Sequence, residues 1–213
     1  MFTVLTCIAD QHDPRLLLVA LVICVVSAAT GLSIYARAAA AHGAARVGWS
    51  AVAGFVAGCG VWATHFVAML AYRVQLPITY RFDLTALSLG AAVVILSCGF
   101  FLGARSRGAP GRLAGGATLG GGVVAMHLVG VSAMGGPSIL AWNGKLVAAA
   151  LLVAFLFAAA ALTVVGRGAV LRRFWAAVGL LVAGICGLHF IAMAAITLAP
   201  DALVATQIGR AHV

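Results

Sequence analysis

Long apolar stretches alternate along the chain with short segments that carry nearly all of its charged residues. Six of the stretches contain no charged residue and are long enough to cross a bilayer, which takes about 20 residues of helix. Lipid offers no partner to a backbone N–H or C=O group, so each stretch is predicted to be an α-helix. The predicted spans are residues 16–36, 49–72, 84–104, 113–134, 146–166 and 174–198.

The composition also indicates a membrane protein. Of the 213 residues, 64% are hydrophobic and 8% are charged, which excludes an ordinary soluble domain of this size. The net charge of +9 does not indicate nucleic-acid binding, because the basic residues lie between the spans and not along one face. We interpret them as topology signals rather than a phosphate-binding patch. The predicted partner is therefore the lipid bilayer, and no nucleic acid is expected.

The same basic residues predict how the spans are oriented. One set of alternating loops holds Arg37, Arg46, Arg105, Arg107, Arg112, Arg167, Arg172 and Arg173, and the opposite set holds only Arg73, Arg81 and Lys145. Because cytoplasmic loops are enriched in Lys and Arg, the larger set is predicted to be cytoplasmic. Residues 1–15 then form an external N-terminal segment, in which Asp13 caps the first helix and Pro14 begins it.

Three histidines recur at a fixed interval inside these spans. His65, His127 and His189 are 62 residues apart, in the segments GCGVWATHFVAMLAY (58–72), GGGVVAMHLVGVSAM (120–134) and VAGICGLHFIAMAAI (182–196). A constant period indicates an internal repeat, and a histidine inside a membrane span is costly unless it has a function. The predicted fold is therefore an all-α integral membrane protein built from three repeated helical hairpins. Each histidine should lie about 10 Å below the external interface.

Glycines fill the three helices that carry these histidines. Small residues four apart let membrane helices approach closely, so we expect these helices to pack tightly and to bring the histidines to one level. The glycines concerned are Gly54, Gly58, Gly116, Gly120, Gly121, Gly122, Gly179, Gly184 and Gly187.

Soft side chains accompany the histidines. A methionine follows two of the histidines by four residues, on the same helix face, and another directly precedes the third. Cys186 shares a face with His189. Imidazole, thioether and thiolate groups in a dry pocket suit copper, above all Cu(I), better than magnesium, calcium or manganese. The candidate metal ligands are His65, His127, His189, Met69, Met126, Met193 and Cys186.

Several alternatives to a copper site remain open at this point. Methionine at helical spacing often only packs, and a buried neutral histidine can be hydrogen-bonded by a neighbouring hydroxyl or carbonyl group, which would leave a structural scaffold. Paired membrane histidines can also ligate haem, and a copper transporter is a further possibility. His12 and His42 lie outside the repeat. Asp10, His12 and Asp13 could hold a cation weakly at the external mouth, although Asp13 is better explained as the helix cap, and His42 receives no role. No nucleophile with an adjacent base and no carboxylate pair is present, so the chain is not predicted to be an enzyme.

The repeated segments resemble a known family. WATHFVAML (62–70), AMHLVG (125–130), GLHFIAMAA (187–195) and LTALS (84–88) are similar to the MHYT domain, a six-helix bacterial membrane module named for a Met-His-Tyr-Thr motif. The resemblance runs from about His12 to Ala199. It implies a sensory domain over residues 16–199 of a protein in the bacterial cytoplasmic (inner) membrane, in which copper held by the histidines and methionines senses a diatomic gas or redox state. Such domains commonly precede a cytoplasmic signalling output domain.

The chain departs from the family motif in every copy. The residue before the histidine is Thr64, Met126 or Leu188, and the tyrosine and threonine positions hold only apolar residues. The histidines therefore carry over best, and the loss of hydroxyl groups predicts a drier pocket.

Residues 200–213 form a short tail that we expect to be truncated. The codons ATC GGA AGA GCA CAC GTC would encode residues 208–213 and match the start of a widely used sequencing adapter. We therefore expect these six residues to be a sequencing artefact, with an ordinary short tail as the alternative.

Overall fold

The structure is a computed structural model, and it describes residues 4, 6, 9–73, 79–106, 108–135, 138–166 and 170–200. Six long helices account for most of these residues, and each is long and apolar enough to cross a membrane. They are α2 (Pro14–Ala40), α3 (Gly43–Ala71), α4 (Phe82–Arg105), α5 (Ala109–Ser132), α6 (Gly144–Val165) and α7 (Leu171–Ala194). The predicted fold class and the predicted number of spans are confirmed.

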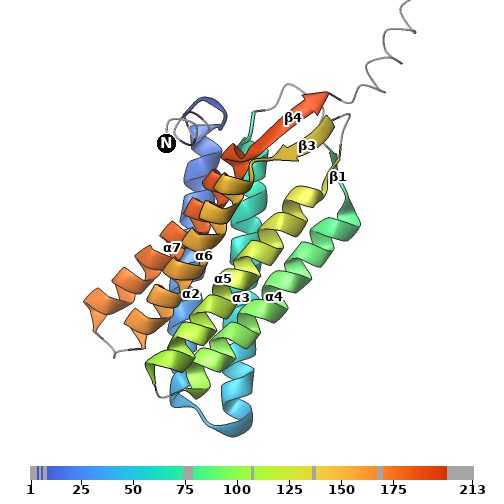
Figure 1. Ribbon diagram of the computed structural model, residues 1–213. Helices are drawn as coiled ribbons and strands as arrows, with labels where there is room; N and C mark the ends of the chain where they lie inside the picture. Colours follow the sequence, from blue (N-terminus) through green and yellow to red (C-terminus); the bar gives the residue numbers. More distant parts are fainter. Residues whose placement is uncertain are drawn as a thin grey trace, which may run out of the picture.

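The helices form three antiparallel hairpins, α2–α3, α4–α5 and α6–α7 (Figure 1). Each helix packs mainly against its neighbours in sequence, and a weaker contact between α2 and α7 closes the ring. We call the end of the bundle where α3, α5 and α7 finish the histidine end. The opposite end, where these three helices begin, we call the arginine end.

Glycines set the spacing between α5 and its two neighbouring helices, α4 and α6. A Cβ atom added to Gly115 of α5 would lie 2.6 Å from the backbone nitrogen of Gly103 in α4. One added to Gly116 would lie 2.5 Å from the Cα atom of Ala159 in α6. Helix α5 therefore approaches both neighbours more closely than any larger residue would allow. The predicted close approach is wrong at Gly179, where no atom would lie within 4 Å of an added Cβ.

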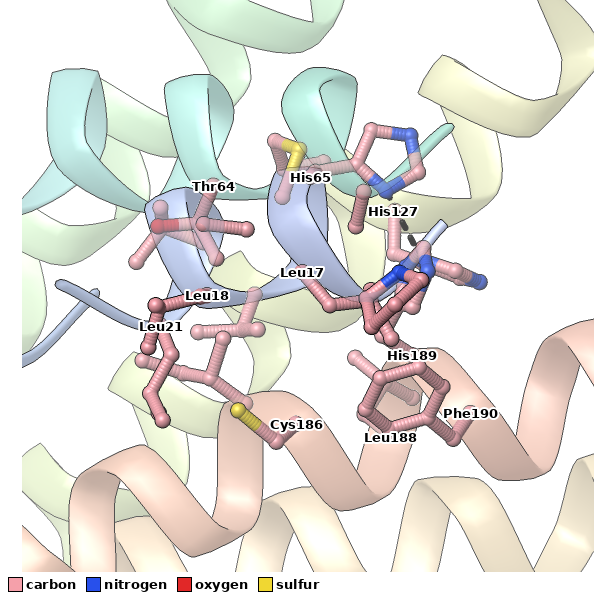
Figure 2. Close-up of a pocket in the computed structure, with 17 residues that line it drawn as sticks. Leu17, Leu18, Leu21, Thr64, His65, His127, Cys186, Leu188, His189 and Phe190 are labelled. Atoms are coloured by element: carbon pink, nitrogen blue, oxygen red, sulfur yellow. Dashed lines mark hydrogen bonds between the residues drawn. The ribbon is translucent and has the colours of Figure 1, made fainter. Parts of the chain in front are cut away.

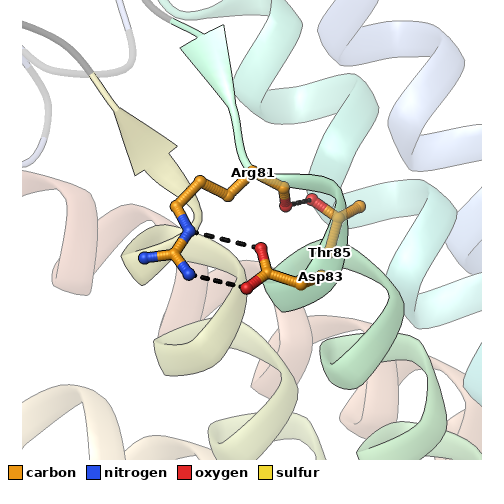
Figure 3. Close-up of polar contacts among 3 residues, drawn as sticks. All are labelled: Arg81, Asp83 and Thr85. Atoms are coloured by element: carbon orange, nitrogen blue, oxygen red, sulfur yellow. Dashed lines mark hydrogen bonds and ion pairs between the residues drawn. The ribbon is translucent and has the colours of Figure 1, made fainter.

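Polar groups at the histidine end fix the starts of two helices. The Asp13 carboxylate accepts a hydrogen bond from the Arg15 N–H at 2.9 Å, with Pro14 beginning α2, so the predicted cap is confirmed. This N–H group and the Arg73 guanidinium hold the pKa of Asp13 below its usual range. At the start of α4, Arg81 donates two hydrogen bonds to Asp83, of 3.2 and 2.6 Å (Figure 3).

Two short antiparallel ladders at the histidine end were not predicted. Strand β1 (Thr79–Tyr80) pairs with β2 (Met134–Gly135), and β3 (Ser138–Trp142) pairs with β4 (Ile196–Pro200). The last span was predicted to continue to residue 198, but α7 ends at Ala194. The segment after it is apolar and contains β-branched residues, which suit a strand once a partner strand is available. Apolarity alone did not distinguish a continued helix from a strand in this segment.

Candidate metal centre

Each histidine of the repeat lies near the end of its helix. His65 is six residues before the last residue of α3, and His127 and His189 are five residues before the last residues of α5 and α7. The three side chains are buried, with 4%, 1% and 6% of their surfaces exposed. Because α3, α5 and α7 run in the same direction, nearly equal distances from their ends bring the three rings to about one level.

The three rings form one cluster (Figure 2). One ligand nitrogen from each of His65, His127 and His189 lies within 4.8 Å of the other two. The Nδ1 atoms of His65 and His127 are 3.2 Å apart. The ring centroids are separated by 4.8 to 5.5 Å, and all three pairs of rings meet edge to face. The expectation that the repeat gathers its histidines is confirmed.

Most of the ring nitrogens in this cluster have no other partner. The Nε2 atoms of His65 and His127 and both nitrogens of His189 are buried and accept or donate no hydrogen bond. Each buried polar group left in this way costs about 1–3 kcal/mol, so such groups are rare in folded proteins. A neighbouring hydroxyl or carbonyl group, the structural alternative raised by the sequence, does not satisfy these nitrogens within the described parts of the chain.

The arrangement fits a metal ion. Three imidazole nitrogens that bind one ion at about 2.0 Å lie about 3.5 Å apart. The Nδ1 pair of His65 and His127 is already this close. The widest separation, up to 4.8 Å, would have to shorten by about 1.3 Å, which a small rotation of the rings and helix ends can provide. Imidazole donors without a carboxylate suit copper or zinc better than a hard cation.

The sulfur-containing candidates lie on two sides of the cluster. Met69 and Met193 pack against Val131 and Ile196, between the histidines and the strands. Met126 and Cys186 lie on the opposite side and line a cavity. The thiol of Cys186 interacts with that of Cys24 in α2, and its sulfur does not belong to the group of close ligand atoms formed by the three histidines.

A fourth histidine covers the cluster, whereas the sequence suggested for it only a weak cation site with Asp10 and Asp13. His12 is only 1% exposed, and its ring centroid lies 6.2 Å from that of His189. Backbone hydrogen bonds hold its segment on both sides, from the Asp13 N–H to Ala71 at 2.8 Å and from the Arg73 N–H to Gln11 at 2.7 Å. The one sequence feature that could have drawn attention to His12 is its position one residue before the cap of α2. Nothing in the sequence indicated that this segment folds back over the bundle.

An apolar cavity of about 410 Å³ extends from the histidines towards the arginine end, between α2, α3, α5 and α7. Figure 2 shows Leu17, Leu18 and Leu21 of α2 on one side of it and Cys186 and Leu188 of α7 on another. Leu18 is 62% exposed on the outer surface of the bundle and also lines the cavity. The cavity therefore reaches the lipid-facing surface beside α2.

Comparison with known proteins identifies the family. The sequence pattern described as the bacterial signalling protein N-terminal repeat, MHYT, matches residues 58–116 and 120–178, which is more than half of the chain. This chain belongs to the MHYT family. The two matched copies begin 62 residues apart, the interval that separates the histidines, so the internal repeat is confirmed. The chain is thus a multi-pass membrane domain of a signalling-protein family.

Three relatives align with most of this MHYT chain. An uncharacterized signaling protein of Caulobacter vibrioides is 39% identical over 202 residues, which are 95% of this chain and 25% of the relative. The cyclic di-GMP phosphodiesterase NbdA of Pseudomonas aeruginosa is 32% identical over 198 residues, 90% of this chain and 25% of NbdA. The bifunctional diguanylate cyclase/cyclic di-GMP phosphodiesterase MucR of the same species is 31% identical over 193 residues, 87% of this chain and 28% of MucR.

The chain therefore spans about a quarter of the length of these relatives. No solved structure matches it.

Proposed function

We propose that this domain is the sensory part of a signalling protein and that it binds one copper ion through His65, His127 and His189. The observation that carries the proposal is the cluster of buried ring nitrogens, four of which have no hydrogen-bond partner in the part of the chain that the structure describes. Bound copper would supply either a binding site for oxygen, carbon monoxide or nitric oxide or a one-electron redox couple. Met69 and Met193 on one side of the cluster, and Met126 and Cys186 on the other, are the further candidate ligands.

The protein supplies the surroundings of this site. His12 and the segment that holds it separate the cluster from water at the histidine end. The apolar cavity gives small uncharged molecules a path from the lipid to the same rings, because it is open at Leu18 and lined almost entirely by hydrocarbon. Diatomic gases dissolve well in lipid, so this path suits them. Hydrated ions would lose their water on entering it and are disfavoured.

We also propose that the arginine end faces the cytoplasm of a bacterium, with the N-terminus outside the inner membrane. The excess of arginine in the loops at that end supports this orientation. The names of NbdA and MucR support a cyclic-di-GMP enzyme as the kind of output domain that such a sensor controls. The domain limits of 16–199 remain a prediction.

The test is elemental analysis of the detergent-purified chain after loading with copper under reducing conditions. The wild type is compared with the triple variant His65→Ala, His127→Ala and His189→Ala. Cys98→Ala serves as the control, because Cys98 is an exposed cysteine on α4 away from the cluster. Circular dichroism and gel filtration establish that each variant is folded.

We expect about one copper per chain in the wild type and the control, and none in the triple variant. Carbon monoxide added to the loaded protein should then give an infrared band that the triple variant lacks. A wild type that binds no copper would overturn the proposal and favour a structural scaffold. Equal copper in all three proteins would show that the metal binds elsewhere, and a haem absorption band in the purified protein would favour haem.

A further inference from the structure

A second cavity, of about 530 Å³, lies at the arginine end of the bundle. Its walls are mostly polar, unlike those of the cavity beside the histidines. Arg46, Arg105 and Arg112 line it, together with the hydroxyl-bearing side chains of Tyr35 and Ser106. The three arginines come from three different helices, α3, α4 and α5, so the fold brings together residues that are far apart in the sequence. Arg105 is exposed, and its guanidinium group also lies 5.9 Å from the centroid of the Phe101 ring on its own helix.

No aspartate that the structure describes lies at the arginine end of the bundle. The aspartates among the described residues are Asp10, Asp13 and Asp83, and all of them lie at the histidine end. Among the described residues that line the cavity there is no carboxylate. Like charges that share a partly enclosed polar space repel one another, and an anion between them removes that repulsion.

Two helix ends add to the positive potential. Helices α3 and α5 both begin beside the cavity, at Gly43 and Ala109, and neither start has a side-chain cap. The N–H groups of a first helical turn carry a partial positive charge and bind anions. Arg46 and Arg112 occupy these first turns, where a basic side chain is normally disfavoured. Two arginines in uncapped first turns beside one cavity favour the binding of a negatively charged group there.

The position of Arg112 is fixed by its neighbours. Its side chain passes directly over Gly166 at the end of α6, where any Cβ atom would collide with the Cδ and Nε atoms of the arginine. The Nε atom is buried in the wall of the cavity. Arg46 is held from the other side, since its Nε group donates a 2.9 Å hydrogen bond to the carbonyl oxygen of Ala41. Both side chains are thereby held in place rather than spread into solvent.

We propose that this cavity binds a phosphate group, either in the headgroup of an anionic lipid or in a soluble phosphate compound. Guanidinium groups present several N–H donors in one plane, which suits the oxygens of a phosphate. The cavity lies at the ends of helices that are long and apolar enough to span a membrane, which is where lipid headgroups are expected. The sequence indicated these arginines only as topology signals, because it could not show that three of them converge.

The test uses the purified chain in neutral detergent with two probes. Native mass spectrometry measures the retention of phosphatidylglycerol against phosphatidylcholine, and thermal unfolding measures stabilisation by inorganic pyrophosphate. Arg46→Gln, Arg105→Gln and Arg112→Gln each remove one charge from the cavity. Gly166→Ala displaces Arg112 and leaves the charge unchanged. Arg172→Gln is the matched control, since Arg172 is exposed at the same end and does not line the cavity.

We expect the wild type and the control to bind one of the two probes equally well, and each cavity variant to bind it about ten-fold more weakly. Preference for phosphatidylglycerol identifies a lipid, and stabilisation by pyrophosphate alone identifies a soluble phosphate. If neither probe binds the wild type, the proposal is wrong. It is also wrong if Arg172→Gln loses as much binding as the cavity variants, because the effect would then be one of net charge. Gly166→Ala keeps the test decisive if an arginine variant fails to fold.

Discussion

Replacing Gly130 by alanine should weaken copper binding without removing any proposed ligand. Gly130 lies on α5, and its Cα faces the imidazole ring of His65. An added Cβ atom would lie 2.6 Å from the Nε2 atom of that ring and 2.9 Å from its Cδ2 atom. Ordinary contacts begin at 3.4 Å, so the ring must retreat by about 0.8 Å.

That displacement is large for a metal ligand. Bond lengths in metal sites are maintained to within about 0.2 Å, so a shift of about 0.8 Å removes His65 from a bonding position unless the whole cluster rearranges. Disturbing the groups that orient a ligand typically lowers metal affinity by about 10- to 100-fold, which corresponds to about 1.4–2.8 kcal/mol. Forcing a methyl group into this contact should also lower the free energy of unfolding by about 1–3 kcal/mol.

The assay is a competition titration of Cu(I) between the protein and a coloured chelator. Gly121→Ala is the control, because it adds the same methyl group to the same helix. Its Cβ atom would meet Phe155 at an ordinary distance of 3.5 Å. A folded Gly130→Ala protein whose copper affinity stays within about two-fold of the control would refute the reasoning, because His65 would then not need the space that Gly130 leaves.

Three further predictions concern packing, access and pH. Gly115→Ala should lower the free energy of unfolding by about 1–3 kcal/mol, since its Cβ would press on the α4 backbone. Gly179→Ala should not lower it, because no atom lies near an added Cβ there. Equal effects of the two substitutions in denaturant titrations would contradict the close contact between α5 and α4. His12→Ala should leave the copper content unchanged but let a hydrophilic chelator remove copper about ten-fold faster; an unchanged rate would show that His12 is not a cover. Because the pKa of Asp13 is lowered in the folded state, its contribution to stability is complete above its usual value of 3.8 and is lost as the pH falls through the lower folded value. Asp13→Asn should therefore show less loss of thermal stability in acid than the wild type, and an identical acid response would exclude this contribution.

The parts of the fold that repeat could be predicted from the sequence. Six uncharged stretches gave six helices, because lipid allows no other conformation for an isolated span. The period of 62 residues placed His65, His127 and His189 at matching positions, and a common helix direction then brought the rings together. Asp13 and Pro14 were predictable as the start of α2 because their local geometry does not depend on the rest of the fold.

The features that depend on which segments become neighbours could not be predicted. His12 has no repeat partner, and its burial follows from backbone hydrogen bonds to residues about 60 positions away. The β3–β4 ladder likewise depends on two strands that α6 and α7 separate in the sequence, since β3 precedes α6 and β4 follows α7. Hydrophobicity also does not say whether a side chain faces lipid or protein. For this reason Gly179 was expected to be in a tight contact, although no atom approaches it.

Helices α3 and α5 link the two ends of the molecule. Each carries a histidine of the cluster near its last turn and an arginine of the second cavity in its first turn, His65 with Arg46 and His127 with Arg112. If the rings draw together by about 1.3 Å on a metal ion, the helices that carry them must shift or rotate, because the glycine contacts leave little free space between them. A helix moves as a stiff rod, so its arginine moves with it.

The contact between α2 and α7 is the weakest in the ring, and it borders the cavity beside the histidines, so the bundle can adjust there at the least cost in packing. Metal binding at one end and phosphate binding at the other would then both act on the same helix arrangement. Each ligand would change the affinity of the protein for the other ligand by the same factor.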